Sequence, residues 1–432
     1  MNYQETIEFL FPLRRFGQKL GLENIQALCD ALGNPERNLG TIVHVAGTNG
    51  KGSVSAMTAS ICKEMGKKVG LYSSPHLACF TERIKINGMS IPKEKVAEYC
   101  TQIKEIVPRI SSTFFEVTTA LAFKYFAEEK VDVSVIETGI GGRLDATNVI
   151  PSSYSVITNV ELEHTEWLGE TKEKIAVEKA DIIRPKSSVF TAAKDLDALE
   201  VITRTARDRK AKIRIASALS DYQIISQEIG LLSVHLRTKR RTYHGLKVPF
   251  SGSYQAENAQ LAILLAEEMG ADELQIRNGL ANVHQNTGHR ARLERVQEKP
   301  VVLLDVSHNP PGMQATVKTI SHYRKNYARV AVVFAALQEK DVASMVAALK
   351  NGCDKIFVSE LKIEKALPAT EIHQICEAQD VRAEVFPNPM DAIAAAKAFV
   401  GEDGLVLITG SFYLAGEVLA FLEPDVLETQ HS

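Results

Sequence analysis

Cysteine is scarce in this sequence and is never closely paired. The 432 residues contain no C-x-x-C motif, and the six cysteines are scattered over Cys29, Cys62, Cys79, Cys100, Cys353 and Cys376. This distribution argues against a disulfide framework and against a cysteine-ligated zinc site, and it favours a reducing compartment. We therefore expect a cytoplasmic protein.

Long apolar runs and an excess of basic charge are also missing. No stretch approaches the roughly 18 apolar residues that a membrane helix needs, and no signal peptide opens the sequence. The formal net charge is −3, without a basic tail or patch. We expect neither a membrane nor a nucleic-acid partner, and we expect a monomer.

The composition is otherwise that of an ordinary globular protein. Hydrophobic residues make up 45% of the chain and charged residues 24%, which argues against disorder. The length exceeds what one core usually supports, so it predicts two or three domains.

Two kinds of apolar pattern alternate in the first half of the chain. Helical spacing covers 5–32, 53–65, 93–107 and 115–129, whereas the pattern of buried strands covers 41–46, 69–72, 131–136 and 154–158. Strands that alternate with helices predict an α/β fold with a mostly parallel sheet covered on both faces.

The pattern changes after residue 212. Segments 231–237 and 242–248 alternate polar with apolar residues and predict a small antiparallel element, and a helix is expected over 256–269. A second series of candidate strands then covers 301–305, 329–334, 355–358 and 405–409. A polar linker with Pro300 separates the two series. We predict domains at 1–296 and 297–432, the second being smaller and Rossmann-like.

A glycine-rich loop lies between the strand at 41–46 and the helix at 53–65. Its sequence, Gly47-Thr-Asn-Gly-Lys-Gly-Ser53, departs from G-x-x-x-x-G-K-[ST], because Val45 replaces the first glycine and Gly52 follows Lys51. Glycines let backbone N–H groups face phosphate oxygens, the helix N-terminus adds partial positive charge, and Lys51 adds a full charge. The loop predicts a nucleotide phosphate site and a P-loop ATPase-like domain; a plain turn is the alternative.

Two polar residues follow strands of the same predicted sheet. Glu137 ends the strand at 131–136, and His164 follows the strand at 154–158. Alone, such an acid is often merely solvated, and a single histidine is more often structural. Because parallel strands end at one edge of a sheet, both residues are expected beside the phosphate loop, where they suit magnesium.

Several motifs together resemble one known family. The loop at 47–53, with Lys-Gly-Ser, resembles the folate branch of the Mur ligase superfamily, and segments 72–77 and 82–88 resemble the substrate loop of folylpolyglutamate synthases and dihydrofolate synthases. Further matches lie at 115–119, 137–148, 168–180, 252–258, 292, 305–309 and 410–413. The matches are collinear over nearly the whole chain, and as a set they are specific.

The resemblance implies a role for each matching residue. ATP would be held by Gly47, Thr48, Asn49, Gly50, Lys51, Gly52 and Ser53 and, from across an interdomain cleft, by Asn258, Arg292 and Asp305. Two Mg²⁺ ions would be held by Ser74, Glu137, His164 and Lys179, the last in carbamylated form. Substrate contacts are expected from Phe80, Arg83 and Glu116, and catalytic roles from Lys51, Lys179 and His308, the last as a base.

The sequence departs from the family's pattern at four positions. Glu163 stands where an aspartate is usual, and Asp181, Ala291 and Ala335 stand where glycines are usual. Asp181 is the departure with the clearest consequence, because its negative charge lies two residues after Lys179 and would oppose carbamylation.

The implied reaction joins L-glutamate to a folate-type carboxylate, dihydropteroate or a tetrahydrofolate polyglutamate, through an acyl-phosphate made from ATP. One alternative is a Mur-type ligase for a cell-wall precursor, but such enzymes carry an added domain before the phosphate loop, which here begins at Gly47. The other is a non-catalytic ATP-binding homologue, which the four departures would fit. The sequence does not distinguish dihydrofolate synthase from folylpolyglutamate synthase activity.

Overall fold

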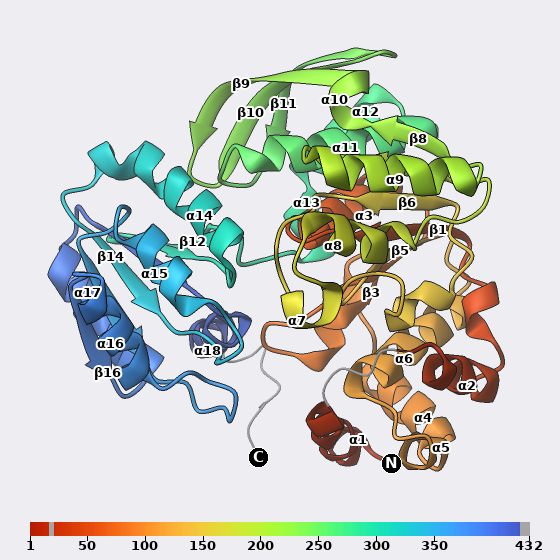
Figure 1. Ribbon diagram of the computed structural model, residues 1–432, viewed down its shortest axis with the longest axis horizontal. Helices are drawn as coiled ribbons and strands as arrows, with labels where there is room; N and C mark the ends of the chain where they lie inside the picture. Colours follow the sequence, from red (N-terminus) through yellow and green to blue (C-terminus); the bar gives the residue numbers. More distant parts are fainter. Residues whose placement is uncertain (17–20, 424–432) are drawn as a thin grey trace.

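Three sheets organise the chain into two lobes. A computed structural model describes residues 1–16 and 21–423 (Figure 1). Within the described residues, the first lobe holds an eight-stranded and a three-stranded sheet, and the second lobe holds a six-stranded sheet. The predicted fold class is confirmed.

The first sheet has the strand order β4-β3-β2-β5-β1-β6-β7-β8. Its strands are β1 (Thr41–Ala46), β2 (Val69–Tyr72), β3 (Ile84–Ile86), β4 (Met89–Ser90), β5 (Val133–Glu137), β6 (Tyr154–Ile157), β7 (Ser188–Thr191) and β8 (Lys212–Ile215). All neighbouring pairs are parallel except those of β3 and β4, which pair antiparallel at one edge. Strands β2, β5, β1 and β6 therefore end side by side at one rim of the sheet.

Helices cover both faces of this sheet (Figure 1). They are α1 (Tyr3–Leu10), η1 (Phe11–Phe16), α2 (Glu23–Ala31), η2 (Pro35–Arg37), α3 (Lys51–Glu64), η3 (Phe80–Arg83), α4 (Lys93–Ile103), α5 (Ile106–Arg109), α6 (Phe114–Glu128), η4 (Ala146–Val149), α7 (Thr165–Leu168), α8 (Lys172–Ala180), α9 (Leu196–Asp208), α10 (Ala216–Leu219), α11 (Tyr254–Glu268), α12 (Glu273–Ala281) and α13 (Val283–Thr287). β1 and β5 are buried almost throughout and rich in valine and isoleucine, as strands covered on both faces require.

The small antiparallel sheet comprises β9 (Ser220–Glu228), β10 (Leu231–Thr238) and β11 (Thr242–Val248). It packs against α3 and α11 through a shared apolar cluster that includes Leu232, Val234 and Tyr243. The predicted hairpin is thereby confirmed, with β9 as an additional strand.

The second lobe is built on the strand order β12-β13-β17-β14-β15-β16. Its elements are β12 (Glu294–Glu298), β13 (Val301–Leu304), α14 (Pro310–Tyr323), η5 (Arg324–Asn326), β14 (Val330–Phe334), α15 (Val342–Leu349), β15 (Lys355–Ser359), α16 (Ala369–Ala378), β16 (Ala383–Phe386), α17 (Pro389–Val400), β17 (Leu405–Thr409) and α18 (Phe412–Leu422). Among the described strands of this sheet, only β12 pairs antiparallel. The domain boundary predicted between 296 and 297 falls within β12 and stays a prediction.

Two predicted helices are interrupted in the described residues. The helix expected over 93–107 is divided into α4 and α5 by a turn at 104–105. The continuous helix expected over 5–32 is instead α1, the 3-10 helix η1 and, after residues outside the described part, α2. Pro12 has no N–H for an α-helical bond, and Gly21 has a φ of 153°, so neither continues a helix. No helix of the described residues is long and apolar enough to cross a membrane.

Candidate active site

The glycine-rich loop connects β1 to α3 as predicted, and α3 begins at Lys51, two residues earlier than expected. Gly50 is the N-cap, with a φ of 85° that side chains rarely adopt, and a β-carbon there would lie 2.5 Å from Asn258 Oδ1. Glycine is therefore required at this position, and the N-terminus of α3, whose first backbone N–H groups have no partner within the helix, lines the cavity described below.

The Lys51 side chain lies along its own loop. Its Nζ donates to the carbonyl oxygens of Gly47 at 3.0 Å and Thr48 at 3.1 Å. An anion bound at the helix N-terminus would compete for this ammonium group, because a phosphate oxygen is a stronger acceptor than a neutral carbonyl.

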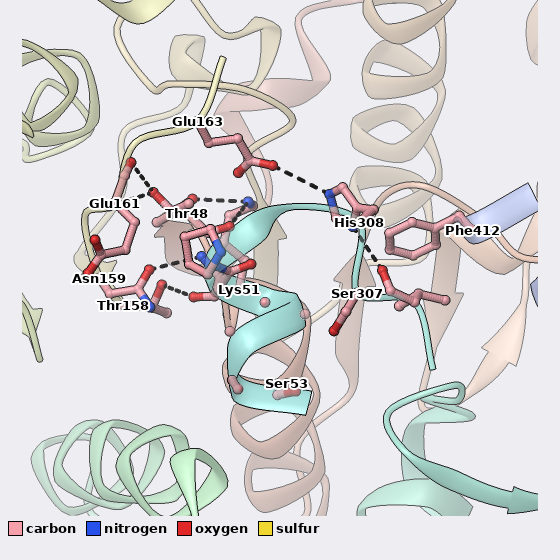
Figure 2. Close-up of a pocket in the computed structure, with 18 of the residues that line it drawn as sticks. Thr48, Lys51, Ser53, Thr158, Asn159, Glu161, Glu163, Ser307, His308 and Phe412 are labelled. Carbon is pink, nitrogen blue, oxygen red and sulfur yellow. Dashed lines mark hydrogen bonds and ion pairs between the residues drawn. The ribbon is translucent and has the colours of Figure 1, made fainter. Parts of the chain in front are cut away.

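The segment that follows β6 fastens the loop from the side. Thr158 Oγ1 donates to the Asn49 carbonyl at 2.7 Å, and Asn159 Oδ1 accepts the Asn49 N–H at 2.9 Å (Figure 2). Sequence reasoning missed both residues. The signal was their place directly after β6, the strand beside β1, where a polar side chain can reach the neighbouring loop.

Glu137 ends β5 within the same rim and is only 4% exposed. Burial raises its pKa to about 7, although the charges of Lys51 and Arg292 act to lower the pKa. A β-carbon at Gly52 would lie 3.7 Å from Glu137 Oε2 and 3.4 Å from Arg292 Nη2. The loop, the strand-end acid and the arginine therefore converge on one point.

Lys179 is a buried cation on α8, with 3% exposure. Burial lowers its pKa to about 7, and the charge of Lys51 lowers the pKa further, while Glu163 and Asp145 oppose the shift. A neutral amine is the form that reacts with carbon dioxide, so this environment suits carbamylation.

Asp181, the departure next to Lys179, is engaged elsewhere. Its carboxylate pairs with Arg209, and Asn148 Nδ2 donates to it at 3.4 Å. Its charge does not contribute to the shifted pKa of Lys179. The extra negative charge is therefore paired with the Arg209 guanidinium.

His164 follows β6 and begins α7 with a left-handed φ of 52°. Burial lowers its pKa to about 4, against the opposing charge of Glu163, so the imidazole is neutral near pH 7, the form that binds metals. Within the described residues, no three histidine, cysteine or acidic side chains gather as a ready metal cluster. A cation here would need Ser74, Glu137, His164 and Lys179 together with ligand oxygens.

The second lobe contributes the opposite wall of the cleft. The His308 ring donates from Nδ1 to the Val306 carbonyl at 2.8 Å and packs on Phe412 at 5.3 Å between ring centroids (Figure 2). The Arg292 guanidinium lies 5.4 Å from the same Phe412 ring. The His308 and Arg292 side chains thus contact the same aromatic ring, in the wall opposite the phosphate loop.

Asp305 is fully engaged within its own lobe. Its carboxylate accepts the Leu293 N–H at 3.1 Å, the Ser307 N–H at 3.1 Å and the Thr316 hydroxyl at 3.0 Å, and it lies 3.4 Å from the Thr409 hydroxyl. These contacts tie the segment that connects the lobes, at Leu293, to the end of β13. Asp305 lines the cleft, but its oxygens already have partners.

A cavity of about 700 Å³ lies between the lobes. It brings together most of the predicted residues, namely Gly47, Thr48, Asn49, Gly50, Lys51, Gly52, Ser53, Ser74, Glu137, His164, Lys179, Asn258, Arg292, Asp305 and His308. Lys340, which sequence reasoning missed, also lines it; the residue lies in a loop after β14 with no pattern to mark it.

Three predicted substrate residues lie outside this cavity lining. Phe80 is 1% exposed and packs edge-to-face on Phe114, and Arg83 Nε donates to His76 Nδ1 at 2.7 Å. Glu116 caps α6 by accepting the Thr113 N–H at 2.6 Å. Their roles in substrate binding stay predictions.

Comparison with known proteins agrees with this arrangement. Residues 45–266 match the Mur ligase middle domain, and residues 291–412 match the Mur ligase glutamate ligase domain. The chain is 34% identical to a dihydrofolate synthase/folylpolyglutamate synthase of Bacillus subtilis, over 96% of this chain and 98% of that one.

Solved structures give the same result. Escherichia coli FolC in complex with DHPP and ADP superposes with a TM-score of 0.89 and 29% identity, over 99% of each chain. A bifunctional folylpolyglutamate synthase/dihydrofolate synthase with Mn, AMPPNP and L-glutamate bound has a TM-score of 0.83 and 30% identity, over 95% of this chain and 96% of that one. The chain therefore belongs to the dihydrofolate synthase/folylpolyglutamate synthase family of the Mur ligases.

Proposed function

We propose that this protein is an ATP-dependent ligase that joins L-glutamate to a folate-type carboxylate. The observation that carries the proposal is the convergence of a lysine-bearing phosphate loop, a buried acid, Arg292 and His308 on one cavity. Relatives that carry both synthase names, and a neighbour with DHPP and ADP bound, support the substrate class.

ATP would place its phosphates at the N-terminus of α3. The backbone amides of 47–53 and the partial positive charge of the helix suit phosphate oxygens. The Lys51 ammonium group would leave the Gly47 and Thr48 carbonyl oxygens and bind the β- and γ-phosphates. Arg292 would approach from the segment that connects the two lobes. We also assign Asn258 and Asp305 to the nucleotide. Asp305 would act indirectly, because its carboxylate fixes the backbone at Leu293 and Ser307.

Two Mg²⁺ ions would be held by Ser74, Glu137, His164 and carbamylated Lys179. The residues fit: Glu137 is a buried carboxyl, Lys179 is a buried amine, and burial shifts the pKa of each to about 7. When bound, magnesium supplies neutralisation of phosphate charge. The bound Mn and AMPPNP of one neighbour support a divalent cation.

The reaction would proceed in two displacements. An oxygen of the substrate carboxylate attacks the γ-phosphorus, the bond from γ-phosphorus to the bridging oxygen breaks, and ADP leaves. The glutamate nitrogen then attacks the acyl carbon, phosphate leaves and the nitrogen loses a proton, for which we assign His308 as base. Lys51 and Arg292 face the charge that develops in the first step.

The acceptor carboxylate would enter from the side of η3 and α6. Phe80, Arg83 and Glu116 lie there, and we assign them to the folate-type substrate, directly or by shaping its channel. A monomeric state, a cytoplasmic location and the division at 296/297 are further proposals; light scattering tests the first.

The test is ADP release in the presence of L-glutamate with dihydropteroate or with tetrahydrofolate. We expect turnover with at least one acceptor and none without glutamate, and the two rates distinguish the two synthase activities. Lys51→Ala should abolish turnover, at least about 100-fold, because it removes the cation at the phosphates. Lys63→Ala is the matched control, because Lys63 lies on the same helix and donates to the Asn87 carbonyl away from the cleft. An active Lys51→Ala protein would overturn the proposal.

A further inference from the structure

One carboxylate of the first lobe faces three side chains of the second. Glu163 lies in the loop after β6, and its side chain is 11% exposed. Its Oε1 accepts the Asn309 amide at 2.8 Å and lies 3.5 Å from His308 Nε2 and 3.9 Å from Lys340 Nζ. Figure 2 shows Glu163 and His308 pointing toward one another across the cavity.

Asn309 makes this contact rigid on the side of the second lobe. Its Oδ1 accepts the Gly312 N–H at 2.8 Å and so caps α14, while its Nδ2 also lies 3.2 Å from Asn49 Oδ1 in the phosphate loop. The cap hydrogen bond links the position of this amide to the first turn of the helix. The position of α14 is therefore coupled both to Glu163 and to the phosphate loop.

The contact is unusual among the acidic side chains of this loop. Glu161, two residues earlier, pairs with Lys172 of its own lobe at 2.7 Å, and its side chain is 37% exposed. A hydrogen bond to a carboxylate in a partly dry cleft is stronger than one between neutral groups. Glu163 is thus placed to hold the lobes, whereas Glu161 is not.

We propose that Glu163 is a positioning residue that holds His308, Asn309 and Lys340 of the second lobe over the phosphate loop. The carboxylate sets the separation of the two walls. Its catalytic consequence rests on the proposed function, whereas its effect on lobe separation does not.

Small-angle X-ray scattering of the nucleotide-free protein tests the structural part. Glu163→Gln keeps the size and an acceptor for Asn309 but loses the charge that attracts the Lys340 ammonium group. We expect a larger radius of gyration for Glu163→Gln and the wild-type radius for Glu161→Gln, with both variants folded by thermal unfolding. Equal radii for wild type and Glu163→Gln would overturn the proposal.

Steady-state ADP release tests the catalytic part. Because misplaced reacting groups slow a positioned reaction, Glu163→Gln should lower kcat about tenfold and change KM for ATP less than about threefold. Glu163→Asp keeps the charge and should recover part of kcat. A higher KM for ATP with unchanged kcat, or an aspartate variant no better than the glutamine variant, would contradict positioning by charge. If the wild type releases no ADP with any folate acceptor, the proposed function fails and the scattering result still decides the inference.

Discussion

The two walls of the cleft differ in how their buried charged groups are stabilised. On the first-lobe wall, Glu137 and Lys179 are nearly inaccessible, and burial shifts the pKa of each toward its neutral form, to about 7. On the second-lobe wall, Asp305 is equally buried, but backbone amides and hydroxyls of its own lobe occupy its oxygens.

This difference suggests two kinds of buried group: Glu137 and Lys179 would bind a ligand, whereas Asp305 stabilises the backbone of its own lobe. A buried charge without partners costs stability, and folded proteins retain such groups where a function requires them. A buried carboxylate with several donors fixes backbone instead. We therefore propose that the first wall serves to bind cations and phosphate, whereas the second wall holds His308 and Arg292 on a preorganised frame.

The largest expected effect is at Lys179. Lys179→Met keeps the length of the side chain and removes the amine, so ADP release should fall at least about 100-fold if the amine, once carbamylated, helps to hold the metal. The same change removes a buried amine. The free energy of unfolding of the metal-free variant, measured by urea titration, should therefore exceed that of the wild type by about 1–3 kcal/mol.

Lys174→Met, on the exposed face of the same helix, is the control for both measurements. It should leave activity and the urea midpoint near the wild-type values. A Lys179→Met protein that is inactive but also less stable would mean that the lysine supports the first wall, and the contrast between the walls would disappear.

The second prediction concerns Asp305, whose substitution should lower stability, whereas Lys179→Met should raise it. Asp305→Asn leaves one acceptor oxygen and turns an NH₂ group toward the donors Ser307 N–H and the Thr316 hydroxyl. We expect the free energy of unfolding to fall by about 2–4 kcal/mol in urea titrations. Asp341→Asn, at the exposed N-cap of α15, should cost less than about 1 kcal/mol. Equal losses for the two variants would show that Asp305 is not the anchor of its wall.

Much of the first wall was predictable because it follows from strand order. Sheets with parallel strands collect loops at one rim, so the phosphate loop, Glu137 and His164 follow from recognising β1, β5 and β6 as strands. Lys179 has no local signature and was found through the family resemblance. The roles given to these residues remain predictions, whereas their meeting at one cavity is observed.

The second wall was less accessible to sequence reasoning. The contacts of Asn309, Lys340 and Glu163 arise from how two separate lobes pack, and no periodicity encodes that packing.

Two signals in the first lobe were available in the sequence. Thr113-Phe-Phe-Glu116 has the spacing of a capping box, which the structure contains. Pro12 likewise marked the end of the first helix within the segment predicted as one helix.

The smallest expected effect is at Asp181. Its substitution tests whether a charge outside the cleft affects the Lys179 amine. Asp181→Asn removes the charge that pairs with Arg209, an ion pair whose side chains are both more than a quarter exposed, so the stability loss should stay within about 1 kcal/mol. Because this charge does not reach Lys179, we expect ADP release and its dependence on added bicarbonate to remain within about twofold of wild type. A marked gain in activity at low bicarbonate would instead show that Asp181 opposes carbamylation, and that the buried amine of the first wall senses charges beyond the cleft.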